Sequence, residues 1–192
     1  MSPAADISEL HADGRARISF RAVNRKGVPG HDPGLQRHHL LPRQLLQRRC
    51  FGRLFDAVGH ERVGFNDFRR NGLLLPAAES AALRLALPLH RGPHRNYNEL
   101  VIERIGQIEH GWSLHRFRAP EVALGQANMR LTLLQRALRR SLLGDRRPFR
   151  LSSKCPLGTG YDFSELDAMA EKLWYGTQEG DKPALALRSI FA

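Results

Sequence analysis

The sequence has little cysteine and no long apolar run. Its two cysteines, Cys50 and Cys155, lie far apart and form no CxxC pair. This excludes a disulfide-dense scaffold and a zinc knuckle built from cysteines. No apolar stretch approaches the roughly 18–20 residues that a membrane span needs, so we expect no membrane partner. The first twenty residues also lack the apolar segment of a Sec signal. We therefore expect a cytoplasmic protein or one exported by a specialised secretion system.

Lysine is also scarce, although the chain is strongly basic. Only four of the 30 basic residues are lysines, and 19 acidic residues leave a net charge of +11. Arginine guanidinium groups bind phosphate oxygens in a bidentate manner, and such a charge attracts polyanions in a salt-dependent way. The composition is therefore compatible with a nucleic-acid partner. The alternative is that the excess charge only keeps the protein soluble.

Apolar periodicity predicts a mostly helical α+β fold. Helical spacing of apolar residues predicts helices over residues 44–58, 93–109, 121–143 and 164–175. Short apolar runs predict strands over 16–23, 36–41 and 73–75, and the Asn71-Gly72 pair predicts a tight turn before the last of these. The chain length fits one domain or one domain with a helical appendage.

Two histidine pairs stand out among the nine histidines, His38-His39 and His90-x-x-x-His94. Imidazole nitrogen binds transition metals, and three imidazoles leave coordination positions open for water and a phosphate. A fourth, neutral imidazole can act as a base. Adjacent residues of an extended chain point to opposite sides, so one of the first pair can bind the ion while the other faces a substrate. A structural metal in a non-enzymatic, basic nucleic-acid-binding protein is the alternative.

Three segments together resemble a known nuclease family. They are QRHHLLPRQLL, GFNDFRRNGLLLP and LPLHRGPHRNYN, spread between Gln36 and Ile105. This ordered set is similar to the AHH nucleases of the HNH/endonuclease VII superfamily, which recur as bacterial polymorphic toxin domains. The resemblance implies a ββα-metal (HNH/treble-clef-like) core over residues 35–110. Residues 1–34 would then be a flexible leader or linker, and residues 111–192 a helical C-terminal extension packed on the core.

The resemblance also assigns roles to individual residues. It implies that His38, His90 and His94 hold one divalent metal ion (Zn, Mg, Mn or Ni) and that His39 is the general base. Asn71 matches the asparagine that braces the hairpin and helps to orient that base, so we place it in the catalytic set with His39.

Other matching positions have less definite roles. Tyr97 follows the last histidine, where it can pack against the metal-binding helix or contact the substrate. Arg37 stands where the family has Ala or Gly. With Arg43, Arg91 and Arg95, it is predicted to line a basic groove for nucleic acid.

Together these features predict a metal-dependent endonuclease that hydrolyses DNA with little sequence specificity, with RNA as the alternative substrate. The resemblance implies a bacterial toxin or effector, restrained by an acidic immunity protein. A housekeeping or phage-defence nuclease with the same chemistry is the alternative.

Overall fold

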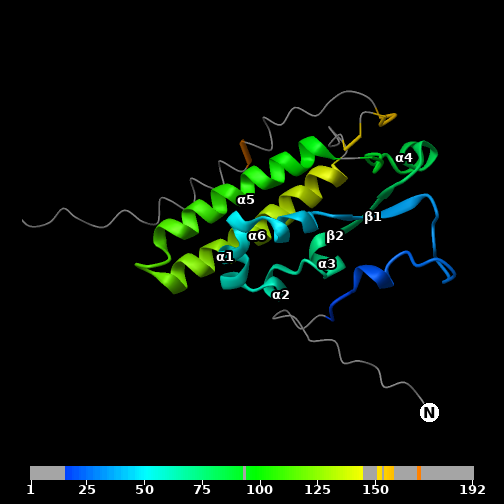
Figure 1. The fold of residues 1–192 in the computed structure, drawn as a ribbon. Helices are drawn as coiled ribbons and strands as arrows, with labels where there is room; N and C mark the ends of the chain where they lie inside the picture. The colour runs from blue at the N-terminus through cyan, green and yellow to red at the C-terminus, as the bar shows by residue number, and fades with distance from the viewer. Residues whose placement is uncertain (1–15, 93, 145–150, 153, 158–167, 170–192) are drawn as a thin grey trace, which may run out of the picture. The chain divides into compact units, whose positions relative to one another are not determined.

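The structure is a computed structural model that describes residues 16–92, 94–144, 151–152, 154–157 and 168–169. It confirms a mostly helical α+β protein with one small sheet (Figure 1). The chain divides between residues 161 and 162 into two units, and every element below lies in the first. In chain order the elements are η1 (Phe20–Ala22), β1 (Leu35–His39), η2 (Arg43–Gln47), α1 (Arg49–Val58), α2 (His60–Val63), α3 (Phe68–Asn71), β2 (Gly72–Pro76), α4 (Glu79–Leu85), α5 (Arg95–His115) and α6 (Pro120–Leu143).

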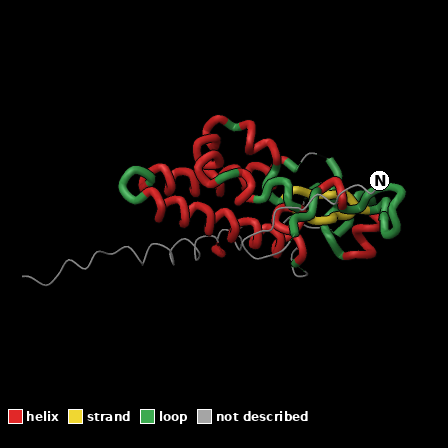
Figure 2. The backbone as a smooth tube through the Cα atoms, turned by 90° about the horizontal axis from the view of Figure 1, so that it is seen from below, coloured by secondary structure: helices red, strands yellow, loops and turns green. Residues whose placement is uncertain are grey.

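Helices α5 and α6 are the two longest elements, and they pack side by side (Figures 1 and 2). The apolar face predicted for α5 is confirmed, since Leu100, Val101, Ile105 and Ile108 are all buried. This helix covers Arg95–His115, so it begins and ends later than the predicted 93–109. Helix α6 agrees with its prediction, with a proline in its first turn where the missing N–H costs nothing.

The C-terminal helix predicted over 164–175 falls largely outside the described residues. Within the part of the chain that is described, no helix combines the length and apolarity that crossing a membrane requires.

The sheet consists of β1 and β2, paired antiparallel with His38 opposite Leu73 and His39 opposite Gly72. The predicted Asn71-Gly72 turn is wrong. Asn71 is the last residue of α3, and residues 40–71 connect the strands through three α-helices and η2. A side chain at Gly72 would overlap the ring of Phe68, so glycine is needed here for close packing.

The strand predicted over residues 16–23 is also wrong. Phe20–Ala22 form a 3₁₀ turn, in which the Ser19 hydroxyl accepts a hydrogen bond from the Arg21 N–H. Within this segment only Ala16 and Ser19 are bridge residues, and Ser19 pairs with Asp67. The Asp67 carboxylate accepts from the Ile18 N–H at 3.1 Å and also caps α3 through the Arg69 N–H. These side-chain hydrogen bonds take the place of the regular backbone hydrogen bonds that pair one strand with another.

Asn71 joins three parts of the fold through its buried amide. Its Oδ1 accepts from the Leu41 N–H at 2.7 Å, and its Nδ2 donates to the Leu41 carbonyl at 3.0 Å. Nδ2 also donates to the Phe65 carbonyl at 3.3 Å, and Gln135 of α6 donates to Oδ1 at 3.3 Å. These bonds fix the chain that follows His39 against both α3 and α6.

We predict that Asn71→Ala destabilises the metal-free protein by about 3–5 kcal/mol, because several buried polar groups lose their partners at about 1–3 kcal/mol each. Urea unfolding in EDTA measures the change, with Asn66→Ala as the control because Asn66 is exposed. The free energy of unfolding of the control should stay within about 0.5 kcal/mol of that of the unmodified protein. An Asn71→Ala midpoint equal to that of the control would contradict the bracing role.

Candidate metal centre

Three histidines from separate segments converge beside the sheet. His38 lies on β1, His90 in the loop before α5, and His94 at the N-cap of α5. One ring nitrogen of each lies within 4.8 Å of the others. The backbone N–H of His90 donates to the Pro76 carbonyl at 2.7 Å, and this bond fixes the loop to the end of β2. The predicted ligand set is therefore brought together in space.

The tautomers of the rings suit a metal ion. His94 Nδ1 lies 2.9 Å from the Leu151 carbonyl, which can only accept, so Nδ1 carries the proton and Nε2 is left bare. His90 Nδ1 faces Gln36 Oε1 at 3.3 Å in the same manner. Such outer hydrogen bonds orient metal-binding imidazoles. The Nε2 atom of His38 is buried without a hydrogen-bond partner among the described residues, as a metal ligand would be in a metal-free structure.

Burial keeps the rings of His38 and His90 neutral. It lowers the pKa of His38 well below its ordinary value, and the nearby His90 and His94 lower it further. Burial, followed by the neighbouring His94, lowers the pKa of His90 to about 4. Neutral imidazole is the form that binds metals, so at neutral pH these two rings need not release a proton to bind an ion.

His39 lies on the other side of β1 from the three-histidine cluster. Its ring stacks on Phe20, with centroids 3.8 Å apart and planes inclined by 4°. Burial lowers the pKa of His39 to about 4, with smaller contributions from Arg43 and Arg37. The imidazole is therefore neutral at pH 7 and can accept a proton.

Tyr97 supports the cluster from within the core. Its hydroxyl donates to the Leu40 carbonyl at 2.7 Å, and its ring meets that of His38 edge-on at 5.0 Å. Burial raises the pKa of Tyr97, so the hydroxyl stays protonated. With 1% of its surface exposed, Tyr97 packs behind the histidines and is not placed to touch a substrate.

The four predicted nucleic-acid-binding arginines are all exposed and lie in two places. Arg37 and Arg43 are close enough to His39 to lower its pKa. Arg37 also donates to the Phe20 carbonyl at 2.8 Å. Arg91 and Arg95 follow His90 and His94, on the loop and at the start of α5.

Several supporting residues could not be identified from the motif. They contact the site residues from elsewhere in the chain and are Phe20, Gln36, Gln135 and Leu151. Of these four, only Gln36 could have been found from the sequence, because it precedes His38 by two residues and side chains two apart share one face of a strand. The segment after α6 also contacts the loop before His90, where the Leu89 N–H donates to Cys155 Sγ at 3.4 Å.

The comparisons with known proteins agree with this geometry. A family model described as AHH, a nuclease family of the HNH/ENDO VII superfamily with conserved AHH, matches residues 19–129. The match begins before and ends after the segment of residues 36–105 that carries the motif. No curated protein and no solved structure matches the chain. Since the match covers more than half of the sequence, the chain belongs to the AHH nuclease family of the HNH/ENDO VII superfamily.

Proposed function

We propose that the protein is a metal-dependent endonuclease that hydrolyses the phosphodiester bonds of DNA with little sequence specificity. One observation carries the proposal most directly. A cluster of three imidazoles lies on one side of β1, and a neutral, adjacent imidazole lies on the other. That arrangement offers one ligand of a metal site and a separate base on the same short strand.

In this proposal β1, β2 and α5 form a ββα-metal core. His38, His90 and His94 would hold one divalent ion, and their fit to it is supported by Nε2 of His38, which is buried without a hydrogen-bond partner among the described residues. When bound, such an ion stabilises the negative charge that develops on a phosphate during hydrolysis. Imidazole ligands favour Zn or Ni over Mg.

The remaining roles belong to the side chains around β1. His39 accepts the proton of the attacking water, and Phe20 holds its ring by stacking. Asn71 fixes the chain after His39, and Tyr97 holds His38. The exposed arginines bind phosphates, which carry no sequence information, so we expect little sequence preference.

The number of candidate ligands favours an enzyme over a non-catalytic protein with a structural metal. Structural zinc sites close with four protein ligands, whereas the cluster found in the described residues has three. A plasmid-nicking assay with and without EDTA tests this. Metal-dependent nicking supports the nuclease, and DNA binding without nicking in any of the metals named above supports the alternative.

The biological role as a toxin and the acidic immunity protein stay predictions from the family resemblance. The net charge of +11 supports an acidic inhibitor, because complementary charge speeds association. Toxicity on expression that a neighbouring gene relieves would separate a toxin from a housekeeping or phage-defence nuclease.

We predict that His94→Ala abolishes both metal binding and cleavage, because only two candidate ligands remain. Bound metal is measured by elemental analysis after dialysis, and cleavage by plasmid nicking. His110→Ala is the control, since His110 is an exposed residue of the same helix. Full metal content in the His94 variant would remove His94 from the ligand set.

We predict that His39→Ala retains metal but cleaves about 10²–10⁴-fold more slowly, the usual effect of removing a general base. The same two assays are used, with His115→Ala as the exposed-histidine control. Cleavage at the rate of the unmodified protein would exclude His39 as the base. Loss of metal together with cleavage would assign it a structural role instead.

A further inference from the structure

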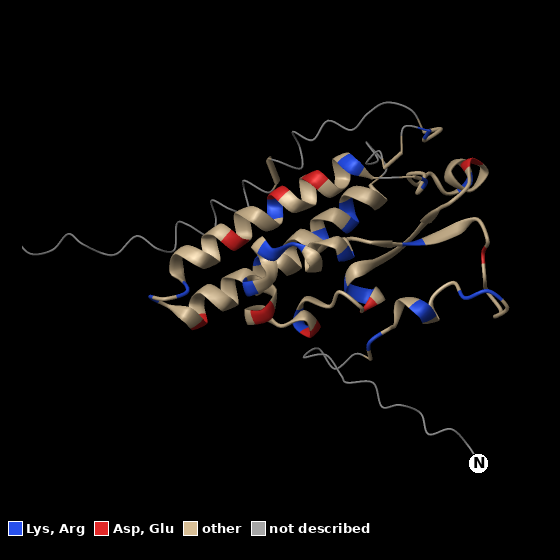
Figure 3. Cartoon of the chain, in the orientation of Figure 1, with Lys and Arg blue, Asp and Glu red and all other residues tan. Residues whose placement is uncertain are grey.

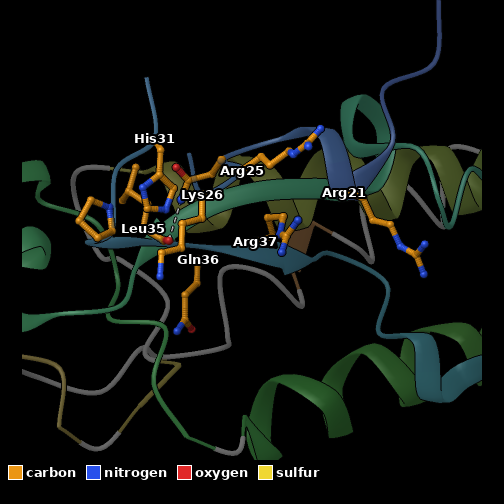
Figure 4. Close-up of a pocket in the computed structure, with 9 residues that line it drawn as sticks. Arg21, Arg25, Lys26, His31, Leu35, Gln36 and Arg37 are labelled. Carbon is orange, nitrogen blue, oxygen red and sulfur yellow. Dashed lines mark hydrogen bonds between the residues drawn. The ribbon is translucent and has the colours of Figure 1, made fainter. Parts of the chain in front are cut away.

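A basic pocket with a volume of about 850 Å³ lies between β1 and the segment that precedes it (Figure 4). Its charged lining consists of Arg21 from η1, Arg25 and Lys26 from the following loop, and Arg37 from β1. Figure 3 shows basic positions on these same elements. In Figure 4, Gln36 projects from the opposite side of β1 to Arg37. None of the three candidate metal ligands lines the pocket, although Gln36 both lines it and contacts His90.

Hydrogen bonds hold the loop of the pocket in shape. Asn24, which has a positive φ of 47°, donates from Nδ2 to the carbonyls of Asp32 at 2.8 Å and Leu35 at 2.9 Å. Its Oδ1 accepts from the Asp32 N–H at 2.8 Å. Gly27 and Gly30 supply two further left-handed turns. A loop fixed in this way presents its cations without a large ordering cost on binding.

The positive charge of the pocket is not neutralised by nearby carboxylates. The acidic residue of the loop, Asp32, accepts from the Gly34 N–H at 2.7 Å and forms an ion pair with Arg84 of α4 at 3.0 Å. Within the described part of the chain, Arg21, Arg25 and Lys26 form no ion pair. The pocket therefore offers several cations to an external anion.

The pocket is connected to the proposed base through one residue. Leu35, Arg37 and His39 alternate along β1, so they share one face of the strand. Arg37 and His39 are separated by roughly 7 Å along the strand. Arg37 also donates to the carbonyl of Phe20, whose ring stacks on His39. An anion in the pocket would thus lie next to the base.

We propose that this pocket is a phosphate-binding subsite for the nucleic-acid strand beside the bond that is cleaved. The inference rests on the proposed function and extends its substrate contacts to residues 21–26. Among the described residues the lining contains no Phe, Tyr or Trp, and the imidazole of His31 is its one aromatic ring, so the pocket offers many more cations than stacking surfaces. It suits the sugar–phosphate backbone, whose oxygens arginine binds well. The shared face with His39 favours a nucleic acid over an acidic protein segment as the occupant.

The test removes the pocket charges without touching Arg37, which holds Phe20. The triple variant Arg21→Gln, Arg25→Gln, Lys26→Gln is compared with Arg53→Gln, Arg62→Gln, Arg118→Gln, which removes the same charge from exposed positions outside the pocket. Both retain His39, whose ring stacks on Phe20, and both are assayed in EDTA so that no divalent ion supports cleavage. The affinity for a fluorescent 20-nucleotide duplex, and for its single strand, is measured by anisotropy over a range of salt concentrations.

We expect the pocket variant to bind the duplex, the single strand or both at least about 10-fold more weakly at 0.1 M salt. A plot of its log affinity against log salt concentration should have a shallower slope, smaller in magnitude by about 2–3, roughly one for each lost phosphate contact. The control variant should change much less in both respects. Equal losses in the two triple variants would overturn the proposal and leave only a general charge effect.

Unchanged binding in the pocket variant would also overturn the proposal, and would point instead to an acidic protein partner. Since the assay measures affinity and not cleavage, its result does not depend on whether the protein proves to be a nuclease. Absence of metal-dependent nicking by the unmodified protein would contradict the proposed function alone.

Discussion

The paired hydrogen bonds between the Asn71 amide and the Leu41 backbone are the constraint on which the site depends. They close the end of β1 against α3, and Gln135 extends the same network to α6. His38 and His39 come just before this fixed point, and Tyr97 binds the carbonyl of the intervening Leu40. The bonds are buried, so water cannot replace them without opening the core.

A strand fixed at one end has two faces with separate tasks. Gln36 and His38 face the three-histidine cluster, where Gln36 contacts His90 and where Nε2 of His38 has no hydrogen-bond partner among the described residues. Arg37 and His39 face the N-terminal segment, where Phe20 stacks on the imidazole. Side chains alternate along a strand, so the neighbouring residues His38 and His39 point to opposite faces of β1. The candidate ligand and the candidate base are therefore adjacent in sequence but lie on different sides of the strand.

The sequence predicted this local arrangement but not the contacts that support it. Alternation separated His38 from His39, and the spacing of apolar residues located the buried face of α5, because both depend on neighbours along the chain. Two predictions were wrong, the strand over residues 16–23 and the turn at Asn71. In both places the local structure is determined by hydrogen bonds to residues distant in sequence. The Asp67 carboxylate binds the first of these segments, and Asn71 uses its amide to brace β1. The carbonyl of Leu151 could not be predicted for the same reason.

Arg37 shows how a departure from the family pattern changes more than one property of a site. It replaces the alanine of the AHH motif with a long cation that reaches the Phe20 carbonyl, lines the basic pocket and lowers the pKa of His39. An alanine at this position could do none of these. The cation favours an anionic substrate but also makes the neighbouring imidazole a weaker base, so the two effects oppose each other. A substitution at Arg37 would change the pocket, the stacked ring and the base together, and its effect on the rate could not be assigned to any one of them.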